Sequence, residues 1–87
     1  MTAPAPGYWM DETTGVLRPA VEAYLHGEPM TAAHLAAMRA YLRQWIAAPV
    51  WAGDRVELLR ATVDDITCRQ GLDLWLDAAM KEGIDPL

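Results

Sequence analysis

The sequence contains no phenylalanine, one cysteine, one lysine and no long hydrophobic run. The single cysteine, Cys68, excludes a disulfide within the chain and a zinc site built from cysteines. No apolar stretch approaches the ~18 residues needed to cross a bilayer, so we expect no membrane segment. Residues 1–7 lack the basic residues and the hydrophobic core of a secretory signal. These absences together predict a cytoplasmic protein.

Positive charge is scarce as well. Seven Lys and Arg stand against twelve Asp and Glu, which gives a net charge of −5. Proteins bind nucleic acids mainly through cations that neutralise phosphates, so we do not expect DNA or RNA as a partner. The charge is uneven, because residues 31–51 carry +2 and residues 52–87 carry −4. We therefore expect the basic helix to pack beside the acidic ones. The preference for arginine over lysine, with much alanine, is typical of a GC-rich bacterial or phage genome.

Apolar side chains are plentiful, since 53% of the 87 residues are hydrophobic and four are tryptophan. That length and content predict a single domain, which has to bury roughly 60–65% of the surface of its unfolded chain. Residues 1–7, with two prolines and a glycine, predict a disordered tail, and residues 8–87 form the domain. Residues 8–17 predict an irregular loop pinned by Trp9.

The first half of the domain shows two helical patterns. One runs from about residue 18 or 19 to 26, with Val21, Tyr24 and Leu25 on its apolar face. The other spans 32–47 and places Leu35, Met38, Leu42, Trp45 and Ile46 on one stripe. Thr31 is the expected N-cap of this second helix.

The second half shows two more patterns. A helix begins at Asp54, where Glu57 completes a capping-box spacing, and Val56, Leu59, Val63 and Ile66 form its stripe. A second capping-box spacing at Thr67 and Gln70 indicates a break, after which another helix begins at Cys68. Its apolar face holds Cys68, Leu72, Trp75, Leu76 and Ala79, and Gly83 ends it. The expected fold is therefore all-α: a compact bundle of four short helices with an irregular N-terminal loop.

Catalytic and metal-binding patterns are missing. The chain has no Gly-rich phosphate loop, no Gly-x-Ser-x-Gly elbow and no His-Glu-x-x-His motif. His26, His34 and Cys68 lack the close spacing of zinc ligands. Cys68 falls on an apolar face, so we expect it to be buried as a small hydrophobic residue. We expect no enzyme activity, no cofactor and no metal.

Aromatic residues outside the core stripes give the leading functional hypothesis. Trp9 and Trp51 lie in non-helical segments, where core and interface roles are both open, and Tyr41 lies off the main stripe of its helix. Exposed Trp, Tyr and Arg are the types most enriched in binding hot spots. These residues predict a non-enzymatic module that binds a protein partner or a second copy of itself.

The acidic residues give the alternative hypothesis. Asp73 and Asp77 are spaced i, i+4 on the polar side of the last helix, and with Asp64 and Asp65 they form an acidic ridge. Such a ridge would suit a small inhibitor that mimics nucleic acid and blocks a basic surface. DNA reading by Arg69 and Gln70 is a third hypothesis, which the nearby acids and the net charge disfavour.

Overall fold

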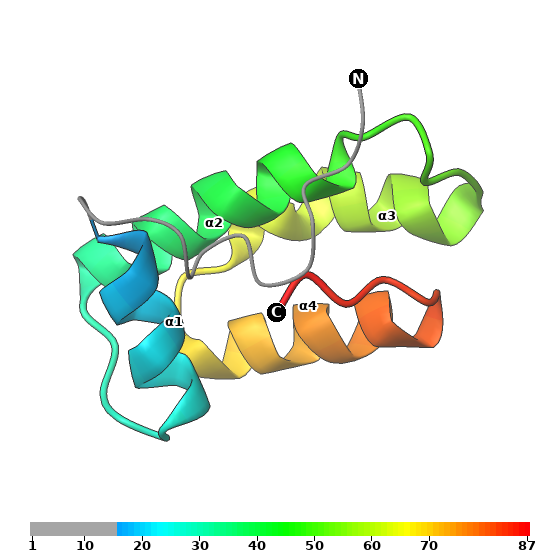
Figure 1. Cartoon of the computed structure of the whole chain (residues 1–87). Coiled ribbons are helices and arrows are strands. Elements are labelled where there is room, and N and C mark those ends of the chain that lie inside the picture. The colour runs from blue at the N-terminus through cyan, green and yellow to red at the C-terminus, as the bar shows by residue number, and fades with distance from the viewer. Residues whose placement is uncertain (1–15) are drawn as a thin grey trace.

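The computed structural model describes residues 16–87, and the regular structure within them is entirely helical (Figure 1). The elements are α1 (Leu17–Leu25), α2 (Ala32–Ile46), α3 (Asp54–Thr62), a single 3-10 turn η2 (Val63–Asp65) and α4 (Arg69–Lys81). The predicted all-α bundle of four short helices is thus confirmed. The N-terminal tail and the loop expected around Trp9 lie outside the described residues.

The four helices form two layers (Figure 1). Helices α2 and α3 lie in one layer, and α4 runs below them, antiparallel to α3. Helix α1 crosses one end of the bundle and packs against α2. After α4 the chain turns back along that helix, so that the C-terminus ends in the middle of the molecule. This return places the last residues beneath α2.

The core contains most of the predicted stripes. All the stripe residues expected on α2 and α3 are less than a tenth exposed, and so are the four from Leu72 to Ala79 on α4. The C-terminal tail adds Ile84 and Pro86, which are fully buried although they follow the last helix. Helix α1 differs from expectation, because it buries Leu17, Ala20 and Val21 while Leu25 is 53% exposed. Helix α1 begins at Leu17, one or two residues before the predicted start, and its buried face runs through Leu17, Ala20 and Val21, which leaves Leu25 exposed at the end of the helix.

The helix ends follow the sequence in part. The side chain of Thr31 accepts a bond from the His34 backbone N–H (3.0 Å), and His34 Nδ1 accepts one from the Thr31 N–H (3.2 Å), so Thr31 is the predicted N-cap. Gly27 and Gly83 adopt positive φ just past α1 and α4, and each closes a Schellman motif.

The capping boxes predicted at Asp54 with Glu57 and at Thr67 with Gln70 do not form, so these two predictions are wrong. Gly53, with φ 120°, is the N-cap of α3, and Asp54 is already helical. The N-cap of α4 is Cys68, whose Sγ accepts a bond from the Gly71 N–H at 3.4 Å. Cys68 is therefore exposed rather than buried, because the cap position lies outside the apolar face of the helix.

Three arginines connect the helices by donating to backbone carbonyls. Arg39 on α2 reaches the Ile66 carbonyl after η2 (2.6 Å). Arg60 on α3 reaches three carbonyls: that of Ile46, the last residue of α2 (2.8 Å), and those of Ala48 (3.3 Å) and Trp51 (2.8 Å) in the connection that follows. Arg69 on α4 bonds the carbonyls of Ala23, Tyr24 and Glu28 at the end of α1. Each guanidinium thus satisfies helix-end carbonyls that have no partner within their own helix.

The expected pairing of basic and acidic segments appears at one point. Arg43 on α2 forms an ion pair with Asp64 in η2. Both side chains are more than half exposed, so the pair adds little stability by itself. The pair instead helps to position η2, because it acts together with the Arg39 bond that holds η2 against α2.

We predict that Arg60→Met lowers the free energy of unfolding by about 2 kcal/mol, because methionine keeps the packing of the side-chain stem and leaves part-buried carbonyls without a donor. Arg18→Met is the matched control. Within residues 16–87 Arg18 pairs with Glu22 alone, and about half of each side chain is exposed, so its loss should cost about 0.5 kcal/mol or less. Urea unfolding of both variants measures the difference. Equal effects would contradict a structural role for the Arg60 bonds.

Candidate functional site: an apolar groove between α3 and α4

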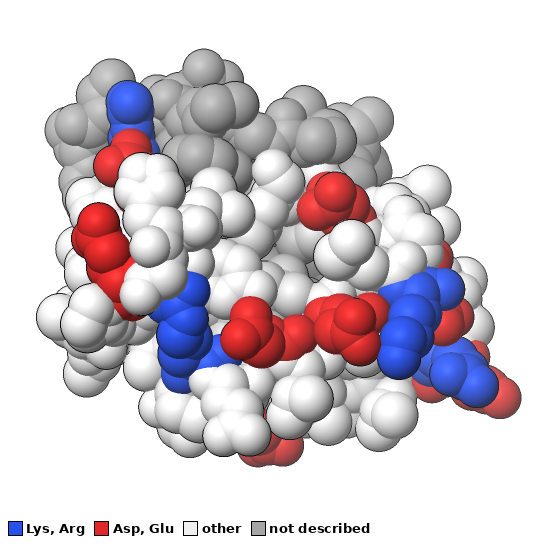
Figure 2. Space-filling view, turned by 90° about the horizontal axis from the view of Figure 1, so that it is seen from below, with Lys and Arg blue, Asp and Glu red and all other residues white. Residues whose placement is uncertain are grey.

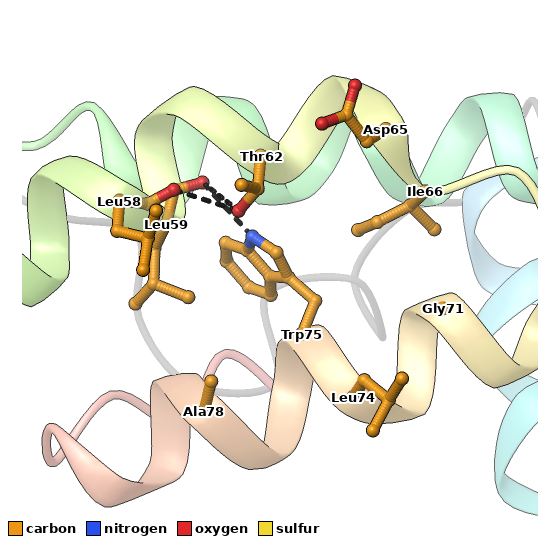
Figure 3. Close-up of a pocket in the computed structure, with 9 residues that line it drawn as sticks. All are labelled: Leu58, Leu59, Thr62, Asp65, Ile66, Gly71, Leu74, Trp75 and Ala78. Atoms are coloured by element: carbon orange, nitrogen blue, oxygen red, sulfur yellow. Dashed lines mark hydrogen bonds between the residues drawn. The ribbon is translucent and has the colours of Figure 1, made fainter.

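An open groove of about 360 Å³ runs between α3 and α4 (Figure 3). Its walls come from both helices and its lining is mainly apolar. The lining residues are Leu58, Leu59, Thr62, Asp65, Ile66, Gly71, Leu74, Trp75 and Ala78. A smaller depression of about 170 Å³ continues it past Leu58 and Ala78 toward Arg55, Lys81 and Glu82.

Trp75 forms the floor of the groove. Its indole reaches from α4 to α3, where Nε1–H donates to the Leu59 carbonyl at 3.1 Å (Figure 3). The side chain is 5% exposed, so this bond satisfies a polar group that would otherwise be buried without a partner. The bond fixes the distance between the two helices and keeps the groove open along its length.

The rims of the groove come from a second stripe on each helix. On α3 and η2 this stripe is Arg55, Leu58, Thr62 and Asp65. On α4 it is Gly71, Leu74, Ala78 and Lys81. Both repeat at i, i+3, i+7, i+10, which places each set along one side of a helix next to the buried stripe. The most exposed apolar members are Leu58 (63%) and Leu74 (67%).

Sequence reasoning did not single out Leu58 or Leu74, although the signal was present. The buried stripe of α3 is Val56, Leu59, Val63 and Ile66, and the second stripe precedes it by one residue at every position. Leu58 is the apolar member of this second stripe, whose other residues are Arg55, Thr62 and Asp65, so it widens the apolar arc of α3 at one position. Leu74 does the same on α4.

The groove is charged differently at its two ends. Because α3 and α4 are antiparallel, Asp65 lies at one end with Gly71, and Arg55 lies at the other with Lys81 and Glu82. Lys81 is already paired with Asp77 at 3.2 Å. The apolar middle is therefore flanked by an acidic end and an end that carries the exposed Arg55.

The aromatic patch expected from the sequence does not assemble as predicted. Tyr41 is 3% exposed and belongs to the core, where its hydroxyl donates to the Pro86 carbonyl at 2.6 Å. The expectation that Tyr41 lies off the core stripe is wrong, because the returning C-terminal tail covers that side of α2. Trp51 is half-buried against the core, and Trp9 lies outside the described residues.

Asp73 and Asp77 are exposed on α4, as expected, but each has a partner of its own. Tyr24 donates its hydroxyl to Asp73, and Asp77 pairs with Lys81. Seen from the α4 side, acidic groups lie next to one another in a row that has basic groups at both ends (Figure 2). Asp64 is likewise paired with Arg43. The predicted ridge therefore lacks a continuous run of uncompensated negative charge.

Arg69, considered above as a DNA-reading residue, is held against α1. Besides its three backbone bonds, its guanidinium lies 5.0 Å from the centre of the Tyr24 ring. Its donors and its flat face are thus occupied within the fold. A side chain held in this way is poorly placed to reach a base edge.

The surroundings of Tyr24 shift the pKa of its hydroxyl. Burial, together with the hydrogen bond to Asp73 and the negative charge of that carboxylate, raises the pKa of Tyr24 from 10.0 to about 12, while Arg69 opposes the change. The neutral phenol is therefore the form that the folded protein favours.

We predict a loss of stability between pH 10 and pH 12 that depends on Tyr24. The folded-state pKa is higher than that of the unfolded chain. The neutral phenol therefore contributes its full stability below pH 10 and loses it as the pH rises through 12. Urea midpoints measured across this range should fall more steeply for the wild type than for Tyr24→Phe. Parallel declines would contradict the raised pKa, because other titrating groups are common to both proteins.

No group of three His, Cys, Asp or Glu side chains in residues 16–87 is placed to hold a metal ion. None of the helices in this part of the chain has the length and apolarity to span a membrane. Comparisons with models of protein families, with curated proteins and with solved structures find no match.

Proposed function

We propose that the protein is a non-enzymatic interaction module that binds a protein partner through the α3/α4 groove. The observation that carries this proposal is the exposure of Leu58 and Leu74 on either side of an apolar depression. Grooves of this kind receive apolar side chains that project from a partner helix. The cytoplasmic location expected from the sequence belongs to the same proposal.

The energetic case rests on the surface that a partner would cover. Burying one exposed leucine side chain is worth about 2 kcal/mol. Leu58 and Leu74 lie on opposite rims, so a partner surface that covers the groove would contact both, as well as Ala78 on the α4 side. Isolated apolar side chains on a surface need no explanation, whereas two on the rims of one groove form a patch.

The acidic-inhibitor hypothesis has less support. It needs an uncompensated acidic surface, and Asp64, Asp73 and Asp77 each have a donor or a cation beside them. The net charge of −5 remains its basis. Salt dependence separates the two hypotheses, because apolar contacts persist at high salt and exposed ion pairs weaken.

We predict that Leu74→Glu and Leu58→Glu each weaken partner binding at least tenfold, because a carboxylate would be buried in an apolar contact. Tagged protein is used to capture partners from extract of cells that make the chain, a second copy included, with low-salt and high-salt washes. Affinity for the recovered partner is then measured with purified proteins. Both leucines are exposed, and Leu and Glu have similar helix propensities, so folding should be unaffected.

Val50→Glu is the matched control, because Val50 is as exposed as Leu74 (67%) and lies outside the groove, next to Trp51. Binding that is lost in Val50→Glu and kept in the leucine variants would move the interface to the Trp51 loop. Binding lost at high salt and in Asp73→Asn with Asp77→Asn would favour the acidic inhibitor instead. Either result would contradict the groove as the binding site.

A further inference from the structure

We propose, on the basis of the function proposed above, that the occupant of the α3/α4 face is a second copy of the chain. The two copies are related by a twofold axis that lies in the interface and runs across the helices. In this arrangement α3 lies antiparallel to the partner's α3, and α4 lies antiparallel to the partner's α4. The same face of each copy therefore forms the contact, and its stripes run in opposite directions in the two copies.

Charge complementarity is the first reason. Arg55 and Asp65 lie at opposite ends of the α3 stripe, and within residues 16–87 neither has an ion-pair or hydrogen-bond partner. The ten-residue separation corresponds to roughly 15 Å along a helix, so the two cannot pair within one chain. Reversing the stripe in a second copy brings each Arg55 beside the partner's Asp65, and the dimer gains two such pairs.

Shape is the second reason. Reversal also places Leu58 opposite the partner's Thr62, and Leu74 opposite the partner's Ala78. Each large side chain on the face therefore meets a smaller one, which allows the two surfaces to interdigitate. The same contacts cover the two leucines whose exposure marks the groove.

The alternative twofold orientation is unfavourable. An axis running along the groove would lay α3 over the partner's α4, which places Arg55 at the end that holds the partner's Lys81 and Glu82, and Asp65 beside the partner's Gly71. Asp65 would then face no cation, and the two opposite-charge pairs would not form. A small domain also gains stability from covering an apolar face by self-association, since its own core is limited.

Charge reversal with purified full-length protein tests the arrangement. Arg55→Asp alone places acid against acid at both pairs, and Asp65→Arg alone places base against base. We expect each variant to have an association constant about tenfold below that of the wild type in sedimentation equilibrium. An equimolar mixture of the two variants restores both opposite-charge pairs, so a mixed dimer should form with wild-type affinity.

Arg18→Asp is the matched control, since it changes the net charge by the same amount as Arg55→Asp on the exposed surface of α1. It should leave dimerisation unchanged. Circular dichroism and unfolding midpoints establish that each variant is folded. Because the mixture contains only the two weakened chains, its recovery cannot come from a change in the folding of either one.

Three results would overturn the inference. If the wild-type chain is monomeric at concentrations up to about 1 mM, the proposed dimer does not form. In that case the proposed function is still decided by the Leu58 and Leu74 variants in the capture experiment. If the wild type dimerises but the mixture of the two charge variants does not, the dimer has a different geometry. A dimer insensitive to both leucine substitutions uses another face, and that result overturns the groove as an interface as well.

Discussion

The fold depends on guanidinium groups that bond backbone carbonyls at the ends of short helices. Each α-helix leaves its last four carbonyls without a partner in the helix, and a bundle of short helices has many such groups relative to its core. Arg60 and Arg69 supply donors where α2 and α1 end, and Arg39 does so after η2. Because each arginine comes from a different helix, every bond also fixes the position of one helix relative to another.

Because these arginines bond carbonyls within the fold, their charges are less available on the surface of the protein. Three of the basic residues are turned toward backbone carbonyls, while Asp73 and Asp77 of α4 and Asp64 of η2 lie beside Tyr24, Lys81 and Arg43. The surface between α3 and α4 is different, since its middle is apolar and it carries Asp65 near one end and Arg55 near the other. Within residues 16–87 neither of these two charges has an ion pair. That contrast is why we assign the interaction to this face.

Much of the fold followed from hydrophobic spacing. The stripes of α2, α3 and α4 were predictable because four or more large apolar residues recur at helical intervals in each, and such residues can be buried in only one way. The break after Ile66 was also predictable, although its capping residue was not. Cys68 rather than Thr67 caps α4, because the choice between neighbouring polar side chains depends on the backbone angles of the turn. The burial of Tyr41 and the exposure of Leu25 were not predicted, because both depend on which remote segments pack against their helices.

By itself the sequence determined the helical class, the order and approximate bounds of the four helices, and the absence of recognisable catalytic motifs. These properties depend on local spacing and on residue type. Only the tertiary structure decided which exposed stripes lie side by side. The groove exists because α3 and α4 pack antiparallel through Trp75, and Tyr41 is buried because the C-terminal tail returns beneath α2. Contacts between residues far apart in the chain arise from the packing of whole elements, and no local pattern specifies them.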